Sequence, residues 1–466
     1  MSALPWYSWS EARAQIEAGQ LSHREHVGAL LAHIEAHDGQ INAFLLVTAE
    51  QALDEAHALD EARVRGEVAG PLAGLPIGLK DIIDTAGVRT TCHSALRADN
   101  VPHSDARVAQ RLGAAGALLL GKLATHEFAI GGPSFDLPWP PARNPWDRTR
   151  FPGGSSSGSG AAVAAGMVPL ALGTDTAGSV RNPATHCGIV GLKPTYGLVS
   201  RAGVYPLSFS LDHVGPMTRT VADNALALNC LAGFDATDPG SAKHAAEDYT
   251  RNIHGGVKGL KIGVLRHFYA EDLVAEADIA AGIEAALGVL GDAGAEVIEV
   301  RTRPLREYIE CNRVLLVSEA FSVHEHWLRE CPEKYGALAR ERLAVGAFLT
   351  AADYVQANRT KRVLCDEMAS LFDDVDVLVT ASSMDRTCHI DDPAEVTRTY
   401  QRQSRAPFNL TGLPALSIPC GFDGNNMPLG MQIVAPAFGE ARIYQVAAAY
   451  EAATGWHQRH PDLNTN

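Results

Sequence analysis

The sequence predicts an α/β fold, with one large mixed and mostly parallel β-sheet sandwiched between α-helices. From Gly70 onward, short apolar runs separated by glycine alternate with segments of helical spacing. This alternation is typical of buried strands covered by helices on both faces. Hydrophobic residues make up 46% of the 466 residues and charged residues 20%, which is the balance of a globular protein with a large core.

The first part of the chain predicts helices. Ser8 with Glu11, and Ser22 with Glu25, are the serine and glutamate pairs of two capping boxes, which mark the first turns of helices. A third helix is expected over residues 51–65, where the apolar residues have helical spacing.

The remaining elements follow in chain order. Helices are predicted over 106–116 and near 275–293. Each predicted strand lies in an apolar run of a length suited to a buried strand. These runs are LAGLPIGLKDII, ALLLGKL, PLALGTD, IVGLKPTYG, KIGVL, AEVIEV, DVDVLVT and LPALSIPCG.

No convincing linker divides the chain. We therefore expect a single domain over residues 1–466. Within it, residues 1–65 are expected to form a helical wrap, and residues 70–466 an α/β/α body.

Composition excludes several classes of protein. The net charge of −15 would repel phosphate groups, so we expect neither nucleic acid nor a membrane surface as a partner. No run approaches the ~20 apolar residues of a membrane span, and we expect no signal peptide. Eight cysteines without metal-like spacing indicate reduced thiols. These features predict a cytoplasmic protein.

A serine and glycine run, FPGGSSSGSGAAVAAG at 151–166, has three possible interpretations. A linker is disfavoured, because small apolar residues typical of a closely packed helix follow at once. A P-loop needs a lysine, but no Lys or Arg occurs between Arg150 and Arg181. The dinucleotide fingerprint fails at its third position, Val163. An active-site backbone is the interpretation that remains.

A second glycine-rich turn, LGTDTAGSV at 172–180, follows the strand-like PLAL. Hydrolases expose a serine such as Ser179 on turns of this kind, beside backbone amides that can hold an oxyanion. The serine needs a base, and His126 and His186 are candidates. Lys80 is another, because its apolar neighbours would lower the pKa of its amine. A surface lysine paired with a neighbouring aspartate is the ordinary alternative.

The run VHEHW contains His324, Glu325 and His326, which suggests a metal site. On a helix, however, the two histidines are two positions apart and face different directions. We therefore expect solvated surface residues here and no metal.

Two segments, GGSSSGSGAAVAAG and PLALGTDTAGSVRNPATHCGIVGLKPTYG, resemble the signature of the amidase signature family. These are serine hydrolases that use a Ser, cis-Ser, Lys triad. Five flanking runs also resemble the family: LAGLPIGLKDIIDTAGVRTTC, ARNPWD, SLDHVGPMTRTVAD, PFNLTGLPALSIPCG and MPLGMQIVAP. The resemblance implies the amidase signature fold and an amidohydrolase that acts on linear amide C–N bonds. It implies no cofactor and no metal.

The resemblance also assigns residues to roles. Ser179 matches the nucleophile that forms an acyl-enzyme, Ser155 the serine after a cis peptide bond, and Lys80 the base. The backbone amides that match the oxyanion hole are those of Thr176, Ala177, Gly178 and Ser179. The side chains expected to hold this geometry are Ser156, Asp175 and Arg181.

The substrate pocket is harder to predict. Its expected lining residues are Phe128, Phe135, Trp139, Cys311, Phe321 and Tyr354. Asn182, His186 and the run TASSMD at 380–385 depart from the family pattern, and we expect them to change the shape of the pocket. Aryl amides, aliphatic amides, carbamates, ureas and lactam-like oligomers stay open as substrates.

The main functional expectation is an amidase that hydrolyses a small carboxamide and forms a homodimer. The alternative is the glutaminase subunit of a tRNA-dependent amidotransferase, which works with partner chains. A noncatalytic binding module is disfavoured, because Lys80, Ser155 and Ser179 are all present.

Overall fold

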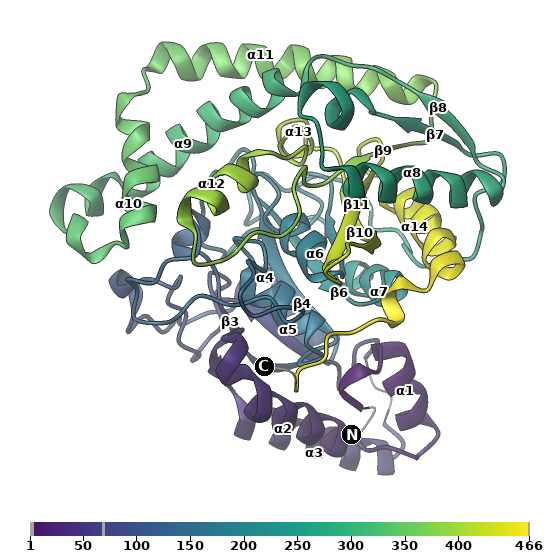
Figure 1. Ribbon diagram of the computed structural model, residues 1–466. Helices are drawn as coiled ribbons and strands as arrows, with labels where there is room; N and C mark the ends of the chain where they lie inside the picture. The colour runs from purple at the N-terminus through teal and green to yellow at the C-terminus, as the bar shows by residue number, and fades with distance from the viewer. Residues whose placement is uncertain (1–3, 68–69, 465–466) are drawn as a thin grey trace.

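The structure is a computed structural model that describes residues 4–67 and 70–464. In this part of the chain, eleven strands form one sheet in the order β1-β3-β2-β4-β6-β5-β10-β11-β9-β7-β8. Helices lie around the sheet, with α1–α3 on one side and α9–α11 on the opposite side (Figure 1). The predicted α/β class, with a mixed sheet between helices, is confirmed.

The bounds of the strands are β1 Phe44–Val47, β2 Pro76–Lys80, β3 Leu118–Leu123, β4 Leu170–Asp175, β5 Val190–Lys193, β6 His213–Thr218, β7 Lys261–Val264, β8 Glu296–Glu299, β9 Val377–Ala381, β10 Ala415–Phe422 and β11 Pro428–Val434. The bounds of the α-helices are α1 Trp9–Glu17, α2 His23–Ile41, α3 Ala49–Val64, α4 Arg107–Ala114, α5 Ser157–Ala164, α6 Arg181–Cys187, α7 Val221–Leu231, α8 Ala277–Asp292, α9 Leu305–Glu330, α10 Ala337–Ala344, α11 Ala351–Ser370, α12 Pro393–Gln401, α13 Ala406–Leu410 and α14 Glu440–Thr454.

Strand pairing divides the sheet into parallel and antiparallel parts. Strand β2 pairs in parallel with β3 and β4, and β7 pairs in parallel with β8 and β9. The other six pairings are antiparallel, which is a larger antiparallel share than the sequence analysis expected. All eight predicted strands form. Strand β6 was missed because Gly215 and Pro216 interrupt its apolar pattern, and both residue types are rare inside strands.

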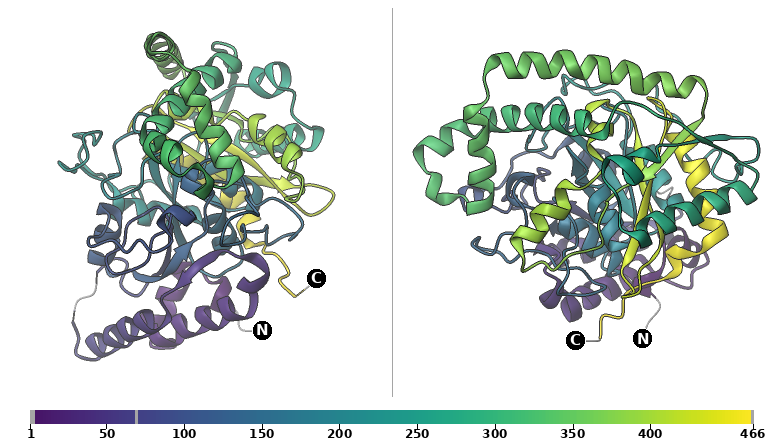
Figure 2. Two further views of the ribbon diagram at one scale, coloured as in Figure 1. Left: turned by 90° about the vertical axis from the view of Figure 1, so that its left-hand side faces the viewer. Right: turned by 45° about the horizontal axis from the view of Figure 1, so that its top comes forward.

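The N-terminal segment packs along one side of the body (Figures 1 and 2). Both predicted capping boxes are confirmed, at Ser8 and at Ser22. The segment is not purely helical, because β1 pairs antiparallel with β3 at the edge of the sheet. Strand β1 was not predicted, since it is only four residues long and lies between two strong helices.

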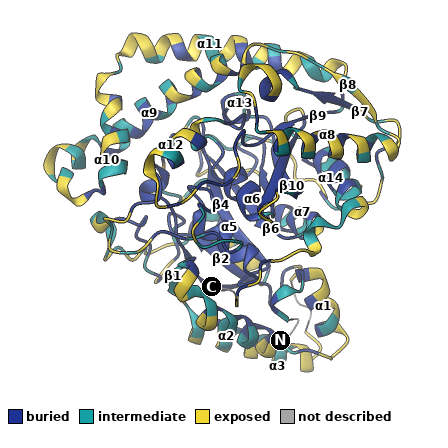
Figure 3. Ribbon diagram, in the orientation of Figure 1, coloured by how far each residue is buried: buried dark blue, intermediate teal, exposed yellow. Residues whose placement is uncertain are grey.

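Helix α5 follows the serine and glycine run and lies in the core. All eight of its residues are buried, and Figure 3 shows the neighbouring strands as equally buried. A Cβ atom on Gly158 would collide with the backbone of Ala43 and Ala124. The small residues of this run therefore allow close packing, which confirms that the run is not a linker.

Strand β2 ends at Lys80, and the adjacent parallel strand β4 ends at Asp175. Because parallel strands end at the same edge of a sheet, their last residues lie near each other. No helix in the part of the chain that the structure describes is long and apolar enough to cross a membrane.

Candidate active site

Lys80 is fully buried at the end of β2. Its Nζ atom donates hydrogen bonds to Ser155 Oγ and to Thr174 Oγ1, both at 2.7 Å. Burial lowers the pKa of Lys80 from 10.5 to about 7, although Asp175 and Asp212 oppose the shift. A neutral amine, which can accept a proton, is therefore available near neutral pH.

Ser155 lies between β3 and α5, and the peptide bond that precedes it is cis. Its carbonyl accepts a hydrogen bond from the amide of His126 at 3.0 Å. The amide of Gly154 donates to Asn182 Oδ1 at 2.9 Å. Asn182 was expected to change the pocket. Instead it holds the backbone just before Ser155 and does not line the cavity described below.

Ser179 lies on the turn between β4 and α6. Its carbonyl accepts a hydrogen bond from the amide of Ser156 at 3.2 Å. Its Oγ lies 3.4 Å from the hydroxyl of Tyr400, which itself donates to the carbonyl of Gly154 at 3.3 Å. The Ser179 hydroxyl is therefore the donor to Tyr400. No hydrogen bond joins the hydroxyls of Ser155 and Ser179 among the described contacts.

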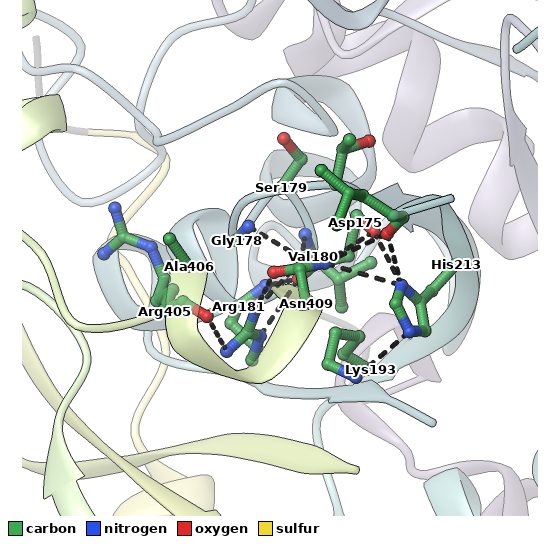
Figure 4. A network of polar contacts seen from close by, with 12 residues as sticks. Asp175, Gly178, Ser179, Val180, Arg181, Lys193, His213, Arg405, Ala406 and Asn409 are labelled. Atoms are coloured by element: carbon green, nitrogen blue, oxygen red, sulfur yellow. Dashed lines mark hydrogen bonds and ion pairs between the residues drawn. The ribbon is translucent and has the colours of Figure 1, made fainter. Parts of the chain in front are cut away.

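The carboxylate of Asp175 holds this turn (Figure 4). It accepts hydrogen bonds from the amides of Gly178 at 2.7 Å and Val180 at 3.1 Å. It also forms an ion pair of 3.0 Å with Arg181, and both side chains are fully buried. Burial alone would raise the pKa of Asp175, but Arg181 holds that pKa well below its ordinary value. The ionised pair gives the turn a fixed shape.

The amides of the turn differ in their availability. Gly178 was expected to contribute to an oxyanion hole, but its amide is already bound to Asp175. The amides of Thr176, Ala177 and Ser179 have no acceptor within residues 4–67 and 70–464. These three can hold a negatively charged oxygen.

Ser156 lies against β4. Its Oγ accepts from the amide of Thr174 and donates to the Thr174 carbonyl, each at 3.2 Å. It therefore fixes the residue whose hydroxyl contacts Lys80.

The two histidine candidates have other surroundings. Burial lowers the pKa of His126 well below its ordinary value, and its Nε2 has no partner among the described atoms. His186 contacts Thr387 Oγ1 through Nδ1 at 3.1 Å, and burial lowers its pKa to about 3. Neither imidazole bonds to a hydroxyl of Ser155 or Ser179 in the described structure, so the geometry favours Lys80 as the base.

A cavity of about 660 Å³ opens at Ser179. Three neighbours of the nucleophile, Thr176, Ala177 and His126, line it together with Tyr400. Its apolar wall consists of Ala129, Ile130, Leu207, Leu273, Ile309, Leu316, Val317, Val345 and Ala406. Its charged side chains are Asp272, Arg306, Glu310, Arg313, Arg342 and Arg402. A second cavity of about 490 Å³ shares Thr176 and Leu207 with it but does not include Ser179.

None of the six expected pocket residues lines this cavity. Phe128 is buried in an aromatic cluster against His324 and Tyr335. Phe135 is exposed, with Arg143 over its ring.

The other four pocket predictions fail for similar reasons. Trp139 packs against His93. Cys311 faces α11 and contacts the carbonyl of Ala357. Phe321 packs against Gly346, and the Tyr354 hydroxyl donates to Glu319. These side chains leave α9 and its neighbours in directions other than toward the cavity.

His186 and the 380–385 run also lie outside the cavity lining. His186 Nε2 and Ser383 Oγ are 3.5 Å apart, behind the turn that carries Ser179. The pocket shape was the wrong expectation for both, because they support the backbone under the site.

The VHEHW prediction is half correct. His326 lies on the surface, with a side chain 73% exposed. His324 is buried and contacts the hydroxyl of Tyr335, because it lies on the inner face of α9. Within the described residues, no group of three or more His, Cys, Asp or Glu could hold a metal ion.

Comparison with known proteins agrees with this site. A model of the Amidase family matches residues 25–444. The A subunit of glutamyl-tRNA(Gln) amidotransferase from Moorella thermoacetica is 40% identical over 95% of this chain and 96% of its own. A solved chain from a vestigial protein complex that reveals the origins of an s-triazine catabolic enzyme is 36% identical, with a TM-score of 0.89 over 96% of this chain and 99% of its own. Peptide amidase from Stenotrophomonas maltophilia is 31% identical, with a TM-score of 0.88 over 99% of this chain and 100% of its own.

The fold and these similarities define an enzyme that hydrolyses amide C–N bonds. The chain belongs to the amidase signature family, as the sequence motifs predicted.

Proposed function

We propose that the chain hydrolyses a small carboxamide through an acyl-enzyme on Ser179. The observation that carries this proposal is the buried Lys80 amine, with a pKa of about 7, bonded to Ser155 at 2.7 Å. When the Ser179 hydroxyl turns from Tyr400 toward Ser155, its proton passes to Ser155 as the proton of Ser155 passes to Lys80. The Ser179 oxygen then attacks the amide carbonyl.

The amides of Thr176, Ala177 and Ser179 hold the negative oxygen of the tetrahedral intermediate. As the C–N bond breaks, the proton returns from Lys80 through Ser155 to the leaving nitrogen. An acyl-enzyme and a free amine or ammonia result. Water then attacks the ester along the same proton route, which releases the carboxylic acid and restores Ser179.

The charge of the cavity supports a substrate that carries a carboxylate. Arg306 pairs with Glu310, and Arg402 pairs with Asp385. Two further arginines of the lining form no ion pair with any acid of the described chain. They are Arg313 and Arg342. A carboxylate would neutralise this surplus positive charge.

Arg342 is the better placed of the two. Burial lowers its pKa, Tyr400 raises it, and Arg313 lowers it further. Its guanidinium makes one hydrogen bond in the described chain, to Thr397 Oγ1 at 3.3 Å. Desolvated N–H donors with few partners bind a carboxylate strongly.

The relatives favour one version of this function, the glutaminase subunit of a tRNA-dependent amidotransferase. Relatives at 37–40% identity over nearly the whole chain share the name of the Moorella thermoacetica protein. Glutamine has a terminal carboxamide and a carboxylate, and its ammonium group would find Asp272 or Glu310 in the cavity lining. We favour this version, in which the chain works in the cytoplasm with partner subunits. The homodimer stays a prediction.

A second candidate is an amidase that acts alone. The structural likeness to a peptide amidase and the long apolar wall of the cavity support it. Glutamine and simple aryl amides would be given to the purified chain, with and without the partner subunits of an amidotransferase. Rapid aryl amide hydrolysis without partners would support the second candidate. Glutamine hydrolysis that depends on partners would support the first.

Replacement of Arg342 by glutamine tests the carboxylate site. A charge-assisted hydrogen bond is worth about 1.5–3 kcal/mol, so Arg342→Gln is expected to raise the KM for glutamine by about 10- to 100-fold. The KM for a neutral amide of similar size should stay the same. Arg340→Gln is the matched control, because Arg340 lies on the same helix, is exposed and does not line the cavity. An equal rise for both substrates would contradict a carboxylate site.

A further inference from the structure

Arg405 is a buried cation without an acidic partner. Its side chain is fully buried, and it forms no ion pair with the described acids. Nη1 donates to the carbonyl of Ser382 at 2.7 Å and to Ser383 Oγ at 2.6 Å. Nε and Nη2 have no acceptor among the described atoms. Burying a charge with unpaired donors costs free energy of folding, so stability alone does not explain this arginine.

The groups around Arg405 do not cancel its charge. The positive charge of Arg181 is balanced by Asp175. Lys193 has a pKa well below its ordinary value because of burial, and burial lowers the pKa of His186 to about 3. Burial lowers the pKa of Arg405 itself only to about 10. At neutral pH, Arg405 is therefore an uncompensated positive charge in this cluster.

Arg405 touches both groups that border the nucleophile. A Cβ atom on Gly178 would collide with Nε of Arg405, so this side chain fills the space beside the turn. The guanidinium also lies 5.9 Å from the ring centroid of Tyr400, whose hydroxyl contacts Ser179 Oγ. Figure 4 shows Arg405 beside Gly178 and Ala406, on the side of the turn opposite to His213.

We propose that Arg405 is a positioning residue for Ser179. Its side chain fixes Gly178 and Tyr400, and its charge lies behind the amides of Thr176, Ala177 and Ser179. A fixed charge in a buried site stabilises negative charge that develops in the transition state, because no solvent has to reorganise. The proposal rests on the function proposed above, since it concerns attack by Ser179.

Two variants separate the charge from the packing. Arg405→Met removes the charge and keeps much of the side-chain length, whereas Arg405→Lys keeps the charge. We expect Arg405→Met to lower kcat on an amide, and the rate of labelling of Ser179 by a fluorophosphonate, by about 10- to 100-fold. KM should change by less than about twofold, since the variant alters the transition state more than substrate binding. The Tm should stay the same or rise, because an apolar side chain replaces a buried charge. Arg405→Lys should recover most of the rate.

Arg219 offers a matched control. It is also nearly buried, it has an unpaired Nη1 within the described structure, and burial lowers its pKa to about 10. It lies by the N-terminal segment, where it donates to the carbonyl of Tyr7. Arg219→Met should leave the labelling rate of Ser179 unchanged.

Three outcomes would overturn the proposal. In the first, Arg405→Met labels at the wild-type rate. In the second, it fails to fold or loses Tm along with rate. In the third, Arg405→Lys recovers nothing. Failure of the proposed function would look different, because the wild-type protein would then neither hydrolyse amides nor be labelled at Ser179.

Discussion

Replacing Ser179 by alanine is expected to abolish the covalent intermediate and to lower kcat by about 10⁵-fold or more, since the nucleophile acts as one unit with its base. The expected fold is unchanged, because only one oxygen atom is lost and its sole described partner is Tyr400 at 3.4 Å. Intact mass spectrometry after treatment with a fluorophosphonate would show the adduct on the wild-type protein and none on Ser179→Ala.

The serine-rich run provides the control. Ser157→Ala changes a buried serine at the start of α5 and should still form the adduct. Labelling of Ser179→Ala at another serine would show that the nucleophile had been assigned to the wrong residue.

Lys80→Met is expected to lower kcat by about 10³- to 10⁴-fold, which is the upper range for loss of a general base. Methionine fills nearly the same volume, and it removes the amine that bonds to Ser155 and Thr174. The stability should not fall much, because a buried amine with a strongly lowered pKa is replaced by an apolar side chain.

Lys122 is a matched control for Lys80. It is also fully buried, burial lowers its pKa to about 8, and it lies on the adjacent strand β3. Its Nζ contacts the carbonyl of Ile83 and Thr90 Oγ1, and bonds neither to Ser155 nor to Ser179 in the described structure. Compared at a temperature where it is folded, Lys122→Met should keep a kcat near that of the wild type. Near-normal turnover by Lys80→Met would remove lysine as the base.

Sequence motifs located the centre of the site but not its walls. Lys80, Ser155 and Ser179 lie in runs whose glycines and small residues are required by close packing, so local sequence marks them. Tyr400 and Arg405 lie in segments without a motif, more than 200 residues further along the chain than Ser179. Their place beside Ser179 depends on how the chain after α11 returns to the sheet, which no local pattern encodes.

The failed pocket predictions have a related cause. Aromatic side chains were chosen for their type, yet the lining of the cavity depends on which face of α9 points inward. Asn312 and Leu316 line the cavity, whereas Cys311 and Phe321 on the same helix do not. Neighbouring positions on a helix point in different directions, and α9 contacts structure on several sides. Periodicity alone does not separate the face toward the cavity from the face toward α11.

The oxyanion hole was predicted with one donor too many, also for a physical reason. Asp175 was expected to support the turn, but its bond to Gly178 removes one of the four expected donors. A carboxylate at the end of a strand can accept either from the turn or from nearby side chains, and sequence does not show which.

The pH dependence of Ser179 acylation tests the central claim most directly. Rapid labelling by a fluorophosphonate would be followed from about pH 5 to about pH 9, on either side of the lysine pKa. The amine of Lys80 accepts a proton only when it is neutral, and its pKa is about 7. The rate should therefore be low in acid, rise with a single midpoint near that pKa and level off above it. A rate that is constant over this range, or highest at its acid end, would contradict a buried lysine as the base.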